Sequence, residues 1–271
     1  MNLTVIVVAF LGSAFAGLTL GLLGGGIGLV LVPLIIWLLN VANVPPHLIM
    51  HLAVGTTVAI TFVVGMLASY QHHSTSKVNW SIVKRMSWGL ILGSAIGAMV
   101  AKYLPSNILM LTFAIVTFLL ALQIWRSSNK KNTTLLVSSN LKKYSLIIGS
   151  FIIGFLGSVL GANPFCVPLL KKMNYEILEA IATTVVIGTI MAIVVVILFI
   201  ILGWSEKGLP AYTTGYIVWP LFLPVLIVSC LFVPIGVKLA GLFSQTTLNR
   251  LYVGLLIGVA LKMIYASGYL Y

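Results

Sequence analysis

The sequence predicts an all-α integral membrane protein made of two inverted repeats, each with a broken or re-entrant first helix pair followed by three transmembrane helices. Three observations lead to this fold class: the composition, the spacing of about eight apolar runs, and a matching pair of helix breaks. Of the 271 residues, 61% are hydrophobic and 7% are charged, whereas about a quarter of the residues in a soluble domain are charged. So little polar surface is typical of a chain that lies in a bilayer.

Composition also excludes several kinds of site. Three glutamates are the only acidic residues, which excludes carboxylate-rich metal sites and the paired carboxylates of glycosidases. The two cysteines, Cys166 and Cys230, both lie in apolar runs, which excludes a disulfide scaffold and a cysteine-based zinc site. The sequence also lacks the Gly-x-x-x-x-Gly-Lys-Ser/Thr loop of nucleotide-driven pumps. We therefore expect no metal and no cofactor.

Apolar runs long enough to cross a bilayer, which takes about 20 residues, alternate with short polar segments. The first run is too long for one crossing, and Gly24–Gly28 interrupts it, because glycine weakens a helix. The fifth run is interrupted at Gly161–Pro164, where proline removes a helix hydrogen bond. The runs are residues 3–39, 47–71, 81–104, 107–125, 144–170, 178–203, 213–237 and 248–268.

Similar segments recur in the same order in the two halves of the chain. The matched pairs are Gly26–Leu34 with Gly161–Leu169, Ala53–Val58 with Ala180–Val185, and Val78–Trp80 with Ile217–Trp219. We predict an N-terminal transmembrane repeat at residues 1–125, a linker at 126–143, and a C-terminal transmembrane repeat at 144–271.

The net charge of +12 comes from basic residues clustered between apolar runs, which indicates positive-inside topology rather than nucleic-acid binding. If each long first run crosses once, ten of the 15 basic residues lie on the linker side. If each first run enters, breaks and returns to its own side, 12 lie there. The second arrangement obeys the positive-inside rule better and makes the halves inverted. We therefore expect a multi-pass protein of the cytoplasmic membrane with residues 126–143 in the cytoplasm.

Inverted repeats with matched broken helices are typical of secondary transporters. At such a break, helix N-termini present free N–H groups and a positive dipole end to an anion, and glycine permits close approach of the ligand. We expect a small anion to contact Gly25, Gly26, Gly28, Gly161 and Asn163. The alternative is that these glycines only allow close helix packing.

Paired threonines follow each break at matched positions, Thr56–Thr57 and Thr183–Thr184. Their hydroxyls could donate to the oxygens of an anion, or they could bond back to carbonyls of their own helices. Cys166 lies beside the second break and could contact a sulfur-bearing substrate. A buried cysteine in such a run also serves as a small hydrophobic residue.

His51 lies within an otherwise apolar segment. An ionisable residue inside a span is a functional candidate, and histidine titrates in the range that suits proton coupling. The alternative is a neutral histidine near the helix start, bonded to a backbone carbonyl.

The motifs Gly24-Gly-Gly-Ile-Gly with Pro33, Ala53-Val-Gly-Thr-Thr and Val78-Asn-Trp, followed by a second copy, resemble the sulfite exporter TauE/SafE family of membrane permeases. The resemblance extends from about Gly17 to Tyr265 and departs from the family pattern at Leu160–Pro164, which replaces a fuller glycine run. It implies transport of sulfite, thiosulfate, sulfoacetate or other small organic anions, powered by an ion gradient.

Two other functional classes remain open beside the transporter. A passive anion channel could use the same repeats, and only uphill flux separates the two classes. An intramembrane enzyme would need a nucleophile–base pair or a metal triad at depth, and the residues offer no such set. We therefore expect a transporter whose partners are a small anion and the lipid bilayer, not nucleic acid. Nothing in the sequence indicates the oligomeric state.

Overall fold

The structure is a computed structural model that describes residues 3–74, 78–128, 139–161, 163, 165–240, 242 and 245–268. Within these residues the chain forms ten helices and one short β-hairpin, which confirms the all-α membrane class. Five helices, α1, α3, α5, α8 and α9, are long and apolar enough to cross a membrane. The elements are α1 (Leu3–Leu23), α2 (Ile27–Val41), α3 (Pro46–Ser74), α4 (Trp80–Tyr103), α5 (Ser106–Ser128), α6 (Ser139–Leu160), α7 (Cys166–Lys172), α8 (Ile177–Gly203), β1 (Thr213–Thr214), β2 (Ile217–Val218), α9 (Trp219–Ala240) and α10 (Gln245–Gly268).

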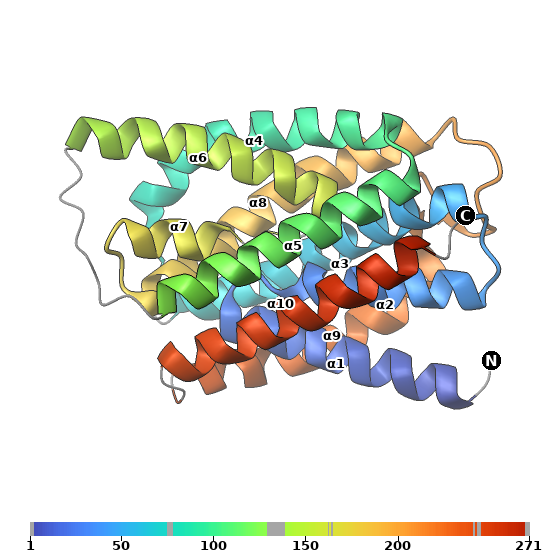
Figure 1. The fold of residues 1–271 in the computed structure, drawn as a ribbon, viewed down its shortest axis with the longest axis horizontal. Coiled ribbons are helices and arrows are strands. Elements are labelled where there is room, and N and C mark those ends of the chain that lie inside the picture. The colour runs from blue at the N-terminus through green and yellow to red at the C-terminus, as the bar shows by residue number, and fades with distance from the viewer. Residues whose placement is uncertain are drawn as a thin grey trace.

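Each half begins with a helix that is interrupted and then turns back. α1 runs inward from the end of the molecule that carries the N-terminus, and α2 returns toward that end (Figure 1). α6 and α7 do the same from the opposite end (Figure 1). The turn after α1 uses Gly24 at φ 74°, and the turn after α6 uses Gly161 at φ 65°. These left-handed conformations favour glycine, which is why the chain breaks at these positions.

The returning helices α2 and α7 also end alike. Asn43 follows α2 at φ 54° and Asn174 follows α7 at φ 67°. Just beyond them, the N–H of Val44 donates to the Leu39 carbonyl at 3.1 Å, and the N–H of Tyr175 donates to the Leu170 carbonyl at 3.2 Å. This bond pattern with a left-handed residue is the Schellman motif that closes helix C-termini.

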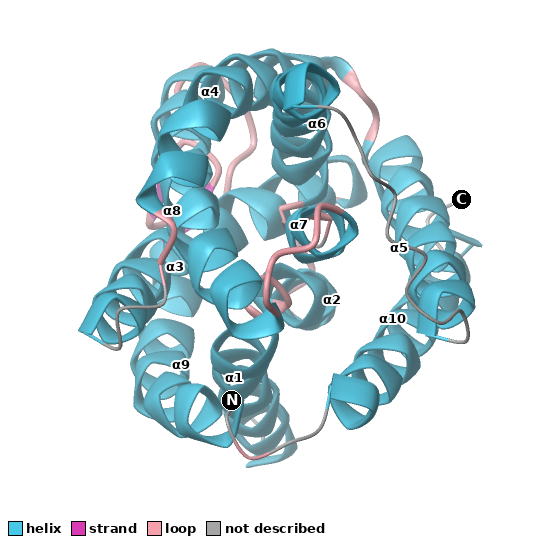
Figure 2. Ribbon diagram, turned by 90° about the vertical axis from the view of Figure 1, so that its left-hand side faces the viewer, coloured by secondary structure: helices cyan, strands magenta, loops and turns pink. Residues whose placement is uncertain are grey.

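Helices from the two halves pack together in matched pairs. α1 packs on α9 as α6 packs on α4, and α3 packs on α9 as α8 packs on α4. Viewed end-on, α2 and α7 lie centrally, the pairs α4–α6, α1–α9 and α5–α10 lie around them, and α3 and α8 lie at one edge between α4 and α9 (Figure 2). If α1 to α5 are exchanged in order with α6 to α10, each of these contacts becomes another of them. The inverted repeat stays a prediction, and this exchange of partners supports it.

One predicted helix boundary differs from the structure. The apolar run at 213–237 does not begin as a helix, because residues 213–218 form the β1–β2 hairpin and α9 starts at Trp219. Hydropathy cannot distinguish the hairpin from the start of the helix, since the strand Ile217–Val218 is as apolar as the helix and is buried. The predicted linker falls mainly on residues 129–138, which lie outside the described residues, as do Ala162 and Pro164 of the second break. Its outer residues, 126–128 and 139–143, continue α5 and α6.

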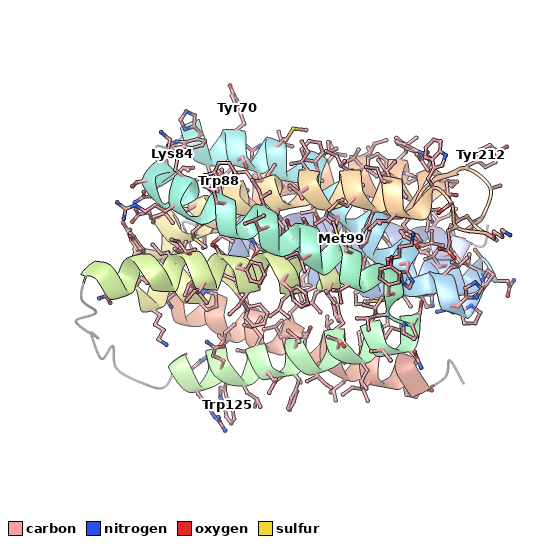
Figure 3. The ribbon with its side chains drawn as sticks, turned by 90° about the horizontal axis from the view of Figure 1, so that it is seen from above. Tyr70, Lys84, Trp88, Met99, Trp125 and Tyr212 are labelled. Carbon is pink, nitrogen blue, oxygen red and sulfur yellow. The ribbon has the colours of Figure 1, made fainter. Side chains whose placement is uncertain are left out.

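Basic residues gather at the end where α4 begins and where α5, α7 and α9 end. Lys84 lies at this end in Figure 3, and exposed Tyr212 lies at the other. Trp88 and Trp125 point outward from the bundle, and both are more than half exposed, as expected of side chains that face lipid or its interface (Figure 3). The basic side chains at the α4-start end include Lys84, Arg85, Arg126, Lys171, Lys172 and Lys238.

Candidate functional site

The two helix breaks meet at one cavity between the halves. Its empty space of about 390 Å³ includes the open solvent at its mouth, so the enclosed volume is smaller. A Cβ atom added to Gly25 would lie 2.6 Å from the backbone carbonyl oxygen of Asn163, so only glycine allows this approach. The described lining residues are Leu20, Gly24, Gly25, Ile27, Gly28, Val58, Thr61, Gly65, Gly161, Asn163, Val185, Gly188, Thr189 and Met191. Thus four of the five residues expected from the breaks line it, and Gly26 lies directly before α2.

Asn163 offers the cavity a side chain without partners. The residue is 6% exposed, and neither Oδ1 nor Nδ2 has a hydrogen-bond partner among the described residues. Nearly all buried polar side chains are paired, because an unpaired polar group costs about 1–3 kcal/mol when it is buried. A carboxamide left in this state at the wall of a cavity is available to a ligand.

The N-terminus of α2 faces the same space. Gly26 is the N-cap and provides no side-chain hydrogen bond, and Ile27 and Gly28 in the first turn line the cavity. The first N–H groups of a helix have no intrahelical acceptor, and the dipole of a helix places about half a positive charge there. An oxygen that carries negative charge is therefore stabilised at this position.

The threonine pairs divide into bonded and unbonded members. The hydroxyl oxygen of Thr56 accepts from the N–H of Val218 at 3.0 Å, and that of Thr183 accepts from the N–H of Asn79 at 3.0 Å. Thr57 and Thr184 are fully buried, and neither hydroxyl has a partner among the described residues. The first threonine of each pair thus forms a hydrogen bond between the halves, and the hydroxyl of the second has no partner among the described residues. Substrate contact by the four threonines stays a prediction.

Thr61 and Thr189 line the cavity and were not expected from the sequence. The Thr61 hydroxyl donates to the Thr57 carbonyl at 2.8 Å, and the Thr189 hydroxyl donates to the Val185 carbonyl at 2.9 Å. These two threonines have no matched copy in the other half, so the repeat does not reveal them. Thr61 follows Thr57 by four residues, which places both on one face of α3, but Thr189 has no such spacing to the second threonine pair.

His51 lies outside the residues that line the cavity. Its ring is 7% exposed and its Nε2 lies 3.0 Å from the Ala101 carbonyl oxygen. A carbonyl only accepts, so Nε2 carries the proton. Nδ1 lies 3.4 Å from the Ser106 hydroxyl, and the ring packs against Tyr216 with centroids 5.4 Å apart. This arrangement matches the alternative of a neutral histidine bonded to a backbone carbonyl. A role of His51 in proton coupling stays a prediction.

Cys166 begins α7 and is fully buried. Its thiol lies beside the Thr184 side chain. Cys166 does not line the cavity as the described residues define it. A contact between its sulfur and a substrate therefore stays a prediction.

Known proteins similar to this chain identify its family. The family model for sulfite exporter TauE/SafE matches residues 9–263. The chain belongs to the sulfite exporter TauE/SafE family. No solved structure matches it.

Two curated relatives of this TauE/SafE chain have similar lengths. A probable membrane transporter protein of Haemophilus influenzae is 30% identical over 262 residues, 96% of this chain and 98% of the relative. The probable membrane transporter protein YdhB of Bacillus subtilis is 25% identical over 242 residues, 86% of this chain and 89% of the relative. Family and relatives together identify the TauE/SafE chain as a multi-pass membrane transporter, in agreement with its apolar helices.

Proposed function

We propose that this TauE/SafE protein is a secondary transporter that carries a small sulfur-containing or organic anion, such as sulfite, thiosulfate or sulfoacetate, across the cytoplasmic membrane. The observation that carries the proposal is the unpartnered, buried carboxamide of Asn163, a residue that lines the same cavity as the first turn of α2. The anion binds between the two breaks, near the middle of the membrane.

The chemistry of the site suits an anion and not a cation. Free N–H groups at the start of α2 and Nδ2 of Asn163 are donors. No acidic side chain is among the described residues that line the cavity, so a cation lacks the carboxylates that would compensate its charge. The unbonded hydroxyls of Thr57 and Thr184 add donors to the central helices beside the site.

Transport proceeds by movement of one half against the other around the site. Because helices pair across the halves, opening on one side means separating α4 from α8, and opening on the other means separating α9 from α3. Asn79–Thr183 and Val218–Thr56 are the bonds that close these two contacts. An ion gradient drives accumulation, and His51 is the residue that couples the two. Residues 126–143 face the cytoplasm, because the basic end of the bundle is favoured on that side of the membrane.

Uptake into proteoliposomes tests the proposal. Labelled sulfite, thiosulfate and sulfoacetate are supplied with and without an imposed pH gradient, and counterflow is measured without a gradient. We expect one of the three to accumulate above equilibrium only when the gradient is present. Saturable flux that never exceeds equilibrium would instead favour a passive channel, and absence of flux for all three would remove this substrate class.

A further inference from the structure

We propose that Ser106, Tyr216 and Glu206 position His51 to hold two ring protons, as the residue that carries the coupling proton must. This inference rests on the proposed coupling role of His51 and names the residues through which that role works. Two independent observations carry it: the acceptors opposite both nitrogens of the imidazole ring, and the aromatic and acidic groups on its face.

The imidazole ring of His51 has an acceptor opposite each of its nitrogens. Nε2 lies 3.0 Å from the Ala101 carbonyl oxygen, and Nδ1 lies 3.4 Å from the Ser106 hydroxyl oxygen. The Ser106 hydroxyl donates its single proton to the His47 carbonyl at 2.6 Å, so it presents only lone pairs to Nδ1. One lone pair accepts from the N–H of Met50 at 3.4 Å, and the other is left for Nδ1.

A neutral imidazole satisfies only one of these two acceptors. Its single N–H donates to the Ala101 carbonyl, and the lone pair of Nδ1 then faces the Ser106 oxygen. The other tautomer would place the same mismatch at Nε2. The separation of 3.4 Å exceeds the distance of about 2.7–3.2 Å in an ordinary N–H···O bond, as expected where two acceptors face each other. A doubly protonated ring has a donor on each nitrogen and therefore fits both acceptors.

The face of the His51 ring packs against Tyr216. The ring centroids are 5.4 Å apart, within the distance of about 6 Å at which an aromatic ring attracts a cation. The Tyr216 hydroxyl donates to Oε2 of Glu206 at 3.2 Å, which holds the carboxylate in place. Burial and the Glu206 charge raise the pKa of Tyr216, so its hydroxyl stays protonated and keeps this bond. The Glu206 carboxylate is close enough to stabilise a positive charge on His51.

Other titratable groups on the elements around His51 lie toward water, which screens their charges. The glutamates Glu176 and Glu179 lie at the start of α8, at the opposite end of the bundle. Among the described residues, Glu206 is thus the carboxylate that compensates a charge on His51. The exposed or partly exposed titratable side chains on these elements are His47, Lys102, Tyr103, Lys207 and Tyr212.

These positioning residues belong to the end of the bundle that opens during transport. Burial disfavours a charged imidazole, and His51 is buried, so its second proton depends on the groups that surround it. Tyr216 lies between the strands β1 and β2, and Val218 of the same hairpin donates to Thr56. Opening this contact changes the surroundings of the ring. That links the proton on His51 to the conformational cycle.

Nuclear magnetic resonance of the purified protein in micelles tests the inference without transport. With an isotopic nitrogen label in the histidine rings, the ring signals distinguish a neutral from a doubly protonated imidazole. The signals of His51 are identified by their loss in His51→Gln. In the native protein we expect them to change from the neutral to the doubly protonated form as the pH is lowered from about 8 to about 5.

Variants identify the groups responsible. Glu206→Gln should move the midpoint of this change about one pH unit lower, because the charged ring loses the carboxylate that stabilises it. Ser106→Ala should move the midpoint in the same direction, because the proton on Nδ1 loses its acceptor. Glu206→Asp keeps the charge and should move it less than Glu206→Gln. Glu176→Gln is the matched control, since it removes an exposed carboxylate at the opposite end and should leave the midpoint unchanged.

Equal midpoints in the native protein and Glu206→Gln would overturn the inference while leaving anion transport in place. A native His51 ring that stays neutral down to about pH 5 would do the same. In proteoliposomes, the pH of half-maximal anion accumulation should move with the midpoint in Glu206→Gln, and an unchanged value would contradict coupling through His51. If no anion accumulates in the native protein, the proposed function fails. The titration still measures the groups around His51, so the two failures are distinguishable.

Discussion

The hydroxyl oxygen of Thr183 accepts a 3.0 Å hydrogen bond from the backbone N–H of Asn79, which ties α8 of one half to the start of α4 in the other. Asn79 Nδ2 also donates to Glu179 at 2.7 Å. The same tie recurs at the opposite end, where Val218 donates to Thr56 just before α9. In both places the residue before the tryptophan that starts a long helix forms a hydrogen bond with the first threonine of a matched pair.

Thr183→Val removes this tie and should lower stability. The substitution keeps the shape of the side chain but leaves the N–H of Asn79 without its acceptor, which costs at most about 1–3 kcal/mol because Asn79 is only partly buried. Thermal unfolding of the purified protein measures the loss. Thr57→Val is the control, since the Thr57 hydroxyl is buried without a partner among the described residues and the change should be nearly neutral. Equal destabilisation by the two variants would contradict the account.

Gly25→Ala should slow transport strongly without preventing membrane insertion. The added Cβ would lie 2.6 Å from the carbonyl oxygen of Asn163, which forces the two breaks apart and disturbs the α2 N-terminus. Gly258→Ala in α10 is the control, because its Cβ would meet nothing within 4 Å. We expect initial uptake rates at least about tenfold lower for the first and within about twofold of native for the second. Native uptake rates in Gly25→Ala would show that the two helix breaks do not form the transport site.

Which structural features can be predicted from the sequence depends on how far apart in the chain the interacting residues lie. Gly24 and Gly161 end helices through local backbone conformation, so both breaks could be found from residue types alone. The tie between Thr183 and Asn79 joins residues 104 positions apart. No local pattern predicts such a bond, and the sequence therefore suggested the same role for both members of each threonine pair.

The hairpin and the lining of the cavity show a second limit. The short strand Ile217–Val218 has the hydropathy of the helix that follows, so an apolar run alone cannot place the helix start. Thr61 and Thr189 reach the cavity because α3 crosses α8 there, a consequence of tertiary packing. Repeat matching finds only positions that both halves share, and these two threonines differ between the halves.

Single cysteines should report the orientation of the bundle. In a background with Cys166 and Cys230 replaced by alanine, Lys207→Cys lies in the loop after α8 and Arg85→Cys lies near the start of α4, both at exposed positions. A membrane-impermeant maleimide applied to intact cells should label Lys207→Cys and should label Arg85→Cys only after the cells are opened. The reverse labelling would place the basic end outside.

His51→Gln separates coupling from structure. Glutamine keeps a donor for the Ala101 carbonyl, which His51 Nε2 now contacts at 3.0 Å, but it does not titrate. We expect the variant to retain counterflow at near-native rates and to lose accumulation driven by a pH gradient. Full accumulation in His51→Gln would show that the histidine only packs and bonds, and coupling would have to be sought elsewhere.

The position of a bound anion tests the central claim most directly. Selenite is a heavier analogue of sulfite, and its selenium can be located by anomalous diffraction or as density in a high-resolution map of the protein equilibrated with it. The account predicts selenium in the cavity between the breaks, with selenite oxygens within hydrogen-bond distance of Asn163 Nδ2 and of the N–H groups that begin α2. Selenite bound at any other place, with this cavity empty in the same map, would contradict the account.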